Sequence, residues 1–179
     1  MRLLLIFVIL ILILVLFADD QAAEQAPAEE DAVTQAHRFF AADFFNKCWE
    51  VMDKIDRTAD DDLNMINMAH ASRAHWQVVG TADNWAVGEW QISRAYSLLE
   101  RAEPCLYHAQ ACLRICQEND ITGFNLGFAY EALGRAQHLL GNKEAAEEFI
   151  DLGRKAAADV ESKEDKEYLL KELDSVLKK

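Results

Sequence analysis

Glycine and proline are scarce in this chain of 179 residues, which contains seven glycines and two prolines. Together they make up about 5% of the residues, against roughly 12% in average proteins. An all-β sandwich or barrel needs many short strands separated by turn residues, so this scarcity excludes such folds. Long segments rich in alanine, leucine, glutamate and lysine favour helices instead. The sequence therefore predicts an all-α protein.

The chain also lacks the motifs that assemble common active sites. It has no G-x-S-x-G nucleophile elbow, no phosphate-cradling glycine loop, and no C-x-x-C or H-x-x-x-H spacing. His70 and His75 are five residues apart, which puts them on different sides of a helix and argues against zinc. We predict a non-enzymatic protein with no metal and no cofactor.

The four cysteines do not suggest a disulfide framework. Cys105, Cys112 and Cys116 are separated by seven and four residues, so they share one face of a helix. Cysteines on one straight helix rarely reach disulfide geometry, and Cys48 is the only cysteine elsewhere. We interpret all four as small core residues.

The net charge of −13 is unevenly distributed along the chain. Residues 1–18 contain one base and no acid, whereas residues 19–36 contain six acids and no base. Without that base and those acids, residues 37–179 carry −8. This acidic balance argues against nucleic acid as a partner. We divide the chain into a signal anchor or signal peptide (1–18), an acidic flexible linker (19–36) and a helical domain (37–179).

The N-terminal segment is a run of sixteen apolar residues, 3–18, that follows Arg2. As a helix it would be about 24 Å long, slightly shorter than a hydrocarbon core of about 30 Å. A retained anchor is favoured over a cleaved signal peptide, because Leu16 stands where a cleavage site needs a small residue. Arg2 before the segment and Asp19 and Asp20 after it favour a body on the non-cytoplasmic side. A misassigned start codon on a cytoplasmic protein is the alternative.

Seven helices are expected from His37 onward, because apolar residues recur there at helical spacing. Their expected ranges are 37–56, 60–79, 83–101, 103–118, 122–140, 142–160 and 163–178. Connections of two to five residues make neighbouring helices antiparallel hairpins.

Two helical stretches are similar at an offset of 41 residues: ISRAYSLL at 92–99 and LGRAQHLL at 133–140. In the helices that follow, Cys105, Ala109 and Cys112 align with Ala146, Ile150 and Gly153. This pattern resembles the tetratricopeptide repeat (TPR) family, in which small residues let two helices pack closely. The resemblance implies stacked antiparallel hairpins that form a short TPR-like α-solenoid, with residues 37–80 as a third, diverged pair. The last helix, 163–179, would cap the stack.

The resemblance also implies a concave groove that binds an extended peptide or a partner helix. The positions that match the family's groove residues are Trp90, Arg94, Ser97, Glu131, Arg135 and His138. Arg94 and Arg135 occupy the same repeat position. Arginines there either hold a carboxylate or peptide backbone of a partner, or pair with neighbours such as Glu89 and Glu131 as structural ties.

The function expected from these features is a non-enzymatic scaffold that binds a protein or peptide, tethered to a membrane through residues 3–18. The rival hypothesis is a small-ligand binder or enzyme built from His75, Trp76, Trp90 and Arg94. It would require those four side chains to converge on one pocket. The sequence does not indicate the partner or the oligomeric state.

Overall fold

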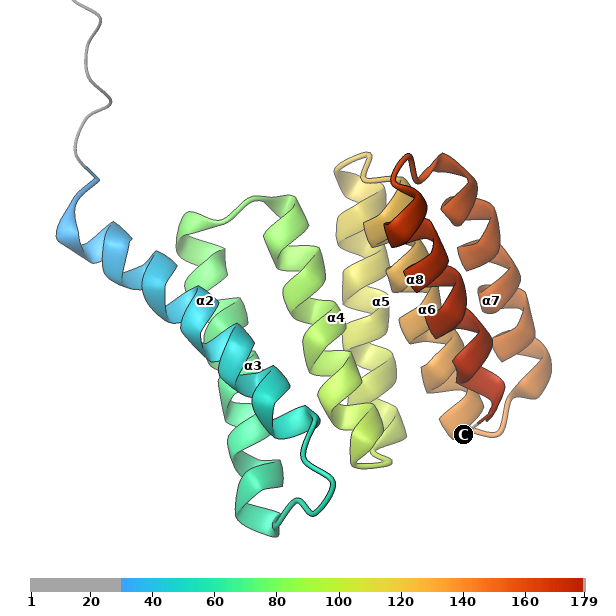
Figure 1. Ribbon diagram of the computed structural model, residues 1–179, viewed down its shortest axis with the longest axis horizontal. Coiled ribbons are helices and arrows are strands. Elements are labelled where there is room, and N and C mark those ends of the chain that lie inside the picture. Colours follow the sequence, from blue (N-terminus) through green and yellow to red (C-terminus); the bar gives the residue numbers. More distant parts are fainter. Residues whose placement is uncertain (1–29, 179) are drawn as a thin grey trace, which may run out of the picture. The chain divides into compact units, whose positions relative to one another are not determined.

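The computed structural model describes residues 30–178, and every regular element in this range is a helix (Figure 1). The helices are α2 (Ala32–Met52), α3 (Ala59–Val79), α4 (Ala82–Leu98), α5 (Ala102–Glu118), α6 (Gly123–Leu139), α7 (Lys143–Ala156) and α8 (Lys163–Ser175). Two 3-10 turns, η1 (Ala157–Asp159) and η2 (Val176–Lys178), follow α7 and α8. The all-α class and the seven expected helices are confirmed. The predicted hydrophobic helix at 1–18 lies outside the described residues.

The largest boundary difference lies at α2, which begins at Ala32 rather than at residue 37. Residues 32–36 are therefore helical, and the predicted linker is five residues too long at this end. Its acidic composition stops at Asp31, and the next residues are compatible with the helix that follows. Residues 19–29 of the predicted linker are not described. Among residues 30–178, no helix is both long and apolar enough to cross a membrane.

Side chains at two helix starts explain where those helices begin. Thr58 precedes α3; its hydroxyl accepts a hydrogen bond from the Asp61 backbone N–H, and the Asp61 carboxylate accepts one from the Thr58 N–H. This reciprocal pair is a capping box, and it confirms the expected acidic start of the second helix. Ser162 caps α8 by accepting from the Asp165 N–H, as the sequence indicated.

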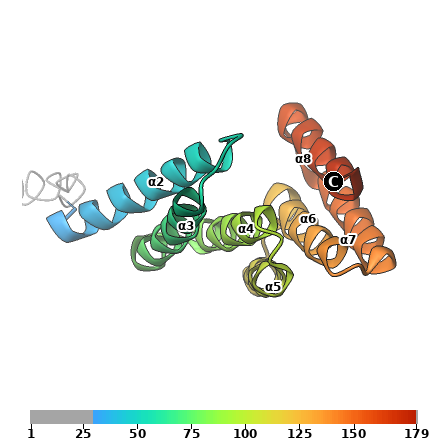
Figure 2. The same cartoon turned by 90° about the horizontal axis from the view of Figure 1, so that it is seen from below.

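The helices form a stack in which each helix contacts its neighbour along the chain (Figure 1). In addition, α4 contacts α6, and α8 contacts both α6 and α7. Figure 2 shows α4 and α6 between the α2–α3 pair and the α7–α8 pair, with α5 on the opposite side from α2 and α8. This arrangement is compatible with a helical repeat.

Matched positions of the two similar stretches make similar contacts. In the α4–α5 hairpin, the hydroxyl of the buried Ser93 donates to the carbonyl of Cys105 at 2.9 Å. At the equivalent crossing of α6 and α7, a Cβ on Gly134 would lie 3.3 Å from the carbonyl oxygen of Ala146. The offset of 41 residues therefore relates positions of close helix approach, which is why small residues stand there.

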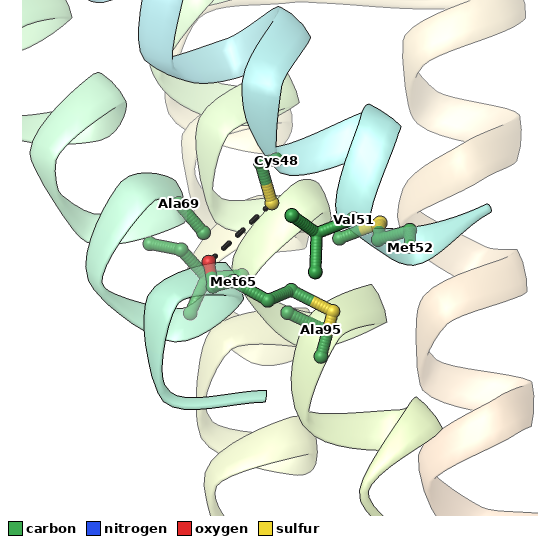
Figure 3. Close-up of a cluster of buried hydrophobic side chains, with 7 residues drawn as sticks. Cys48, Val51, Met52, Met65, Ala69 and Ala95 are labelled. Carbon is green, nitrogen blue, oxygen red and sulfur yellow. Dashed lines mark hydrogen bonds between the residues drawn. The ribbon is translucent and has the colours of Figure 1, made fainter. Parts of the chain in front are cut away.

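The α2–α3 hairpin is joined to α4 by a cluster of buried side chains (Figure 3). The cluster contains Cys48, Val51, Met52, Met65, Ala69, Ile92 and Ala95. The Cys48 thiol donates to the carbonyl of Met65 at 3.5 Å, and burial raises the pKa of this thiol to about 12. All four cysteines are buried and unpaired, which confirms their prediction as core residues.

Two glycines let α8 dock on the stack. A Cβ on Gly127 of α6 would lie 2.4 Å from Cδ2 of Leu169, and one on Gly153 of α7 would lie 2.5 Å from Cδ2 of Leu173. Both leucines are fully buried. The last helix is therefore seated in two notches that only glycine leaves open.

Candidate partner-binding groove

A row of aromatic side chains links α2, α4, α6 and α8 on one side of the stack. The Trp49 and Trp90 rings are 5.7 Å apart, Trp90 and Phe128 are 5.3 Å apart, and Phe128 and Tyr168 are 5.7 Å apart between centroids. These spacings are typical of aromatic packing. In Figure 2, these four helices surround the same side of the stack, opposite α5.

The aromatic row encloses a small apolar hollow, which we call the aromatic pocket. Its volume is about 180 Å³. It is lined by Phe45, Trp49, Ala86, Val87, Trp90, Cys112, Phe124, Asn125, Phe128 and Tyr168. Nearly all of these side chains are apolar, so the pocket fits one apolar side chain or a group of similar size.

A second hollow, which we call the arginine pocket, continues along the same helices toward their other ends. It has a volume of about 390 Å³. It is lined by Arg94, Ser97, Leu98, Glu100, Arg135, His138, Leu139, Ser175 and Val176. Trp90 and Arg94 are one turn apart on α4, and Tyr168 and Ser175 are two turns apart on α8, so both pockets face the same side. We use the word groove for the two pockets together.

A buried ion pair supports the floor of the groove. Glu131 is fully buried and Arg135 is 7% exposed. Both carboxylate oxygens of Glu131 accept hydrogen bonds from the Arg135 guanidinium, and one also accepts from the Trp90 indole N–H at 3.0 Å. Arg135 reaches the Ser97 hydroxyl at 3.5 Å, and its guanidinium carbon lies 5.9 Å from the centre of the Trp90 ring. Glu131 thus ties α6 to α4.

The other arginine at this repeat position has no such partner. The partly buried Arg94 guanidinium makes no hydrogen bond or ion pair with any of residues 30–178. Burial, and then the neighbouring charge of Arg135, lower the pKa of Arg94, while Glu131 and Glu172 act in the opposite direction. A cation that is partly dehydrated and faces a second cation would be stabilised by an anion from outside the chain.

The structure places the six predicted groove residues on one side of the stack but at different depths. Arg94, Ser97, Arg135 and His138 line the arginine pocket, and Trp90 lines the aromatic pocket. Glu131 lies beneath the surface, where its carboxylate is occupied. The structural interpretation of the arginines therefore fits Arg135, and the binding interpretation is kept for Arg94.

Sequence reasoning missed most of the aromatic pocket. Val87 and Phe128 stand 41 residues apart, seven positions before Arg94 and Arg135, so extending the repeat pattern by two turns would have found them. The α2 residues Phe45 and Trp49 had no such signal, because the first hairpin does not share the pattern. Tyr168 lies on the predicted cap, which the sequence did not place against the groove.

The four residues of the rival small-ligand site do not converge. The His75 ring contacts His37, Phe40 and Phe44 at the α2–α3 pair. Trp76 lines a separate hollow, and its carbonyl accepts from the Trp85 indole N–H at 2.8 Å. Trp90 and Arg94 line the groove instead.

A second polar cluster lies between α3, α4 and α5 and serves as a structural tie. Glu89 accepts from Arg73 at 3.0 Å and contacts His108 Nδ1 at 2.7 Å, so both of its oxygens are occupied. Burial would raise the pKa of Glu89, but the hydrogen bond from His108 and the charges of His108 and Arg73 lower it overall. Among residues 30–178, no group of three His, Cys, Asp or Glu side chains is placed to hold a metal ion.

Comparisons with known proteins give no relative from which a role could be transferred: no protein-family model, curated protein or solved structure matches this chain. The groove must therefore be interpreted from its own chemistry.

Proposed function

We propose that this protein is a non-enzymatic, TPR-like scaffold that binds a segment of a partner protein in the groove. The observation that carries the proposal is the adjoining pair of pockets, one aromatic and one containing the unpaired Arg94. Few convergent polar groups beside a mostly apolar hollow are typical of a binding site. The stacked hairpins provide a rigid support for such a site.

The groove assignment is tested by blocking the aromatic pocket. Val87→Trp places a bulky ring in the pocket, and Val78→Trp places the same ring on α3, where Val78 is 62% exposed and lines neither pocket. Peptides selected from a random library on the full chain should lose binding to the Val87→Trp variant and keep it with the Val78→Trp variant. Equal binding to both variants, or a selection that yields no binder, would refute the proposal.

We also propose that residues 3–18 hold the chain at a membrane, with the helical unit on the non-cytoplasmic side. The single base before this segment and the acids after it support this orientation. Protease protection of the native protein, together with N-terminal sequencing, tests it. A protein found in the cytoplasmic fraction with a start after residue 18 would contradict it.

A further inference from the structure

The groove has a polarity along its length that restricts what can occupy it. At one end, side chains from four helices form the aromatic pocket, which contains no charged residue. At the other end, Arg94 faces the arginine pocket without an ion-pair partner among residues 30–178. An occupant that fills both pockets must present an apolar group and a polar group on the same side.

The charges around Arg94 set the sign of that polar group. Arg135 is neutralised by Glu131, since the two form a doubly hydrogen-bonded pair. Glu172 on α8 attracts Arg94 but is not within ion-pair distance of it, and Glu100 is exposed at the rim. His138 adds a further donor to the same pocket. The group with an unfilled requirement is therefore a guanidinium, which a carboxylate satisfies best.

We propose that the groove recognises an acidic segment of a protein, in which an aspartate or glutamate side chain pairs with Arg94 and a nearby apolar side chain enters the aromatic pocket. This inference rests on the proposed function and adds the chemistry of the partner. A positively charged segment is disfavoured, because it would leave Arg94 unpaired and place a second cation beside it.

The spacing of the two side chains follows from α4. Val87 and Arg94 are seven residues apart, which is about 10 Å along a helix. In an extended chain, side chains two or four positions apart point to the same side and are separated by roughly 7 or 13 Å. Since a long acidic side chain and Arg94 both reach along the groove, these two spacings bracket the observed distance.

The test uses the full chain in detergent micelles and short, dye-labelled peptides with blocked ends. Each peptide carries one leucine and one glutamate, separated by two or four positions, in a glycine–serine background. Because both termini are blocked, the glutamate side chain is the only carboxylate. Matched peptides replace that glutamate by glutamine or lysine, and fluorescence anisotropy gives the dissociation constants.

We expect replacement of glutamate by glutamine to weaken binding about tenfold, as for the loss of a charge-assisted contact. The Arg94→Ala variant should remove this preference, whereas Arg114→Ala, an exposed arginine on α5, should retain it. Glu172→Gln should tighten binding of the acidic peptide about twofold, because it removes a competing carboxylate.

The outcomes separate this inference from the proposed function. If library-selected peptides bind in the groove but the glutamate and glutamine peptides bind equally, the acidic specificity is wrong and the groove assignment stands. A preference for lysine, or a glutamate preference that survives Arg94→Ala, also overturns the inference. Failure of every peptide in the series to bind overturns it as well, and the library selection then decides whether a groove function survives.

Discussion

Arg94 in the α4–α5 hairpin and Arg135 in the α6–α7 hairpin occupy the same repeat position and do different things. Four residues before Arg135 stands Glu131, one helical turn away, and the two form a buried ion pair. The residue at the equivalent position before Arg94 is Trp90, which cannot pair with a cation in this way. The Trp90 indole instead donates to Glu131 across the helix contact.

This difference shows that the repeat position decides which face a side chain occupies, whereas its neighbours decide its role. The α6 hairpin is tied on its groove side through Glu131, while the α4 hairpin is tied to α3 and α5 through Glu89. As a result, one arginine is consumed by the fold and the other is left for a partner.

Removing Glu131 should give the largest effect. Glu131→Ala leaves the Arg135 cation and the Trp90 N–H buried without their acceptor, which should cost about 3–5 kcal/mol of the free energy of unfolding. Arg94→Ala removes no contact of this kind and should change stability by less than about 0.5 kcal/mol. Denaturant unfolding of both variants measures the contrast. Equal losses would show that the two arginines are structurally equivalent.

A methyl group in the α8 notch should have the next largest effect. At the position of Gly127, the first hairpin carries Ala86, because no cap helix covers it. Gly127→Ala places a Cβ 2.4 Å from Leu169 and should cost about 1–3 kcal/mol. Hydrogen exchange should show faster exchange in α8 first.

Gly88→Ala on α4 is the matched control for the Gly127 variant. Its new Cβ would meet only the flexible side chain of Arg73, at 2.6 Å, so the side chain can shift and the loss should be smaller. If both alanine variants lose the same stability, seating of α8 does not require the notch.

The tie at Glu89 should appear in the acid limb of the stability profile. The pKa of Glu89 is lowered in the folded protein, so its contribution is present above the ordinary glutamate pKa of about 4.3 and is lost as pH falls through the folded value. Wild type should lose stability more steeply below about pH 4.3 than Glu89→Gln. Glu50→Gln, an exposed glutamate, should follow wild type. Parallel profiles for wild type and Glu89→Gln would contradict the tie.

The smallest effect is expected at the start of the first hairpin, where Nδ1 of His37 and Nδ1 of His75 are 2.9 Å apart. Burial and then the charge of His37 lower the pKa of His75, so this contact favours the neutral ring. Its contribution is present above the ordinary histidine pKa of about 6.5 and is lost below it.

The readout for this histidine pair is hydrogen exchange in the first half of α2, which should become faster when the pH falls below about 6.5. His75→Gln should remove the pH dependence there, and His138→Gln, on α6, should leave it unchanged. An unchanged exchange rate in wild type across this range would disprove the coupling.

Local sequence was sufficient for the helices because their signals are short-range. Apolar periodicity located seven helices, and the Thr58–Asp61 and Ser162–Asp165 pairs marked two of their starts. The start of α2 was misjudged because the alanine-rich residues 32–36 fit both a linker and a helix. Their state depends on the helix that continues from them.

The sequence by itself determined the all-α class, the pairs of small residues at helix crossings and the shared face of Arg94 and Arg135. Each of these follows from periodicity along one helix or from an offset between two. Only the tertiary structure decided that Trp49, Phe128 and Tyr168 line one pocket and that Glu131 is spent on Arg135 and Trp90. These contacts join helices that are distant in the sequence, and no local pattern encodes the distance between them.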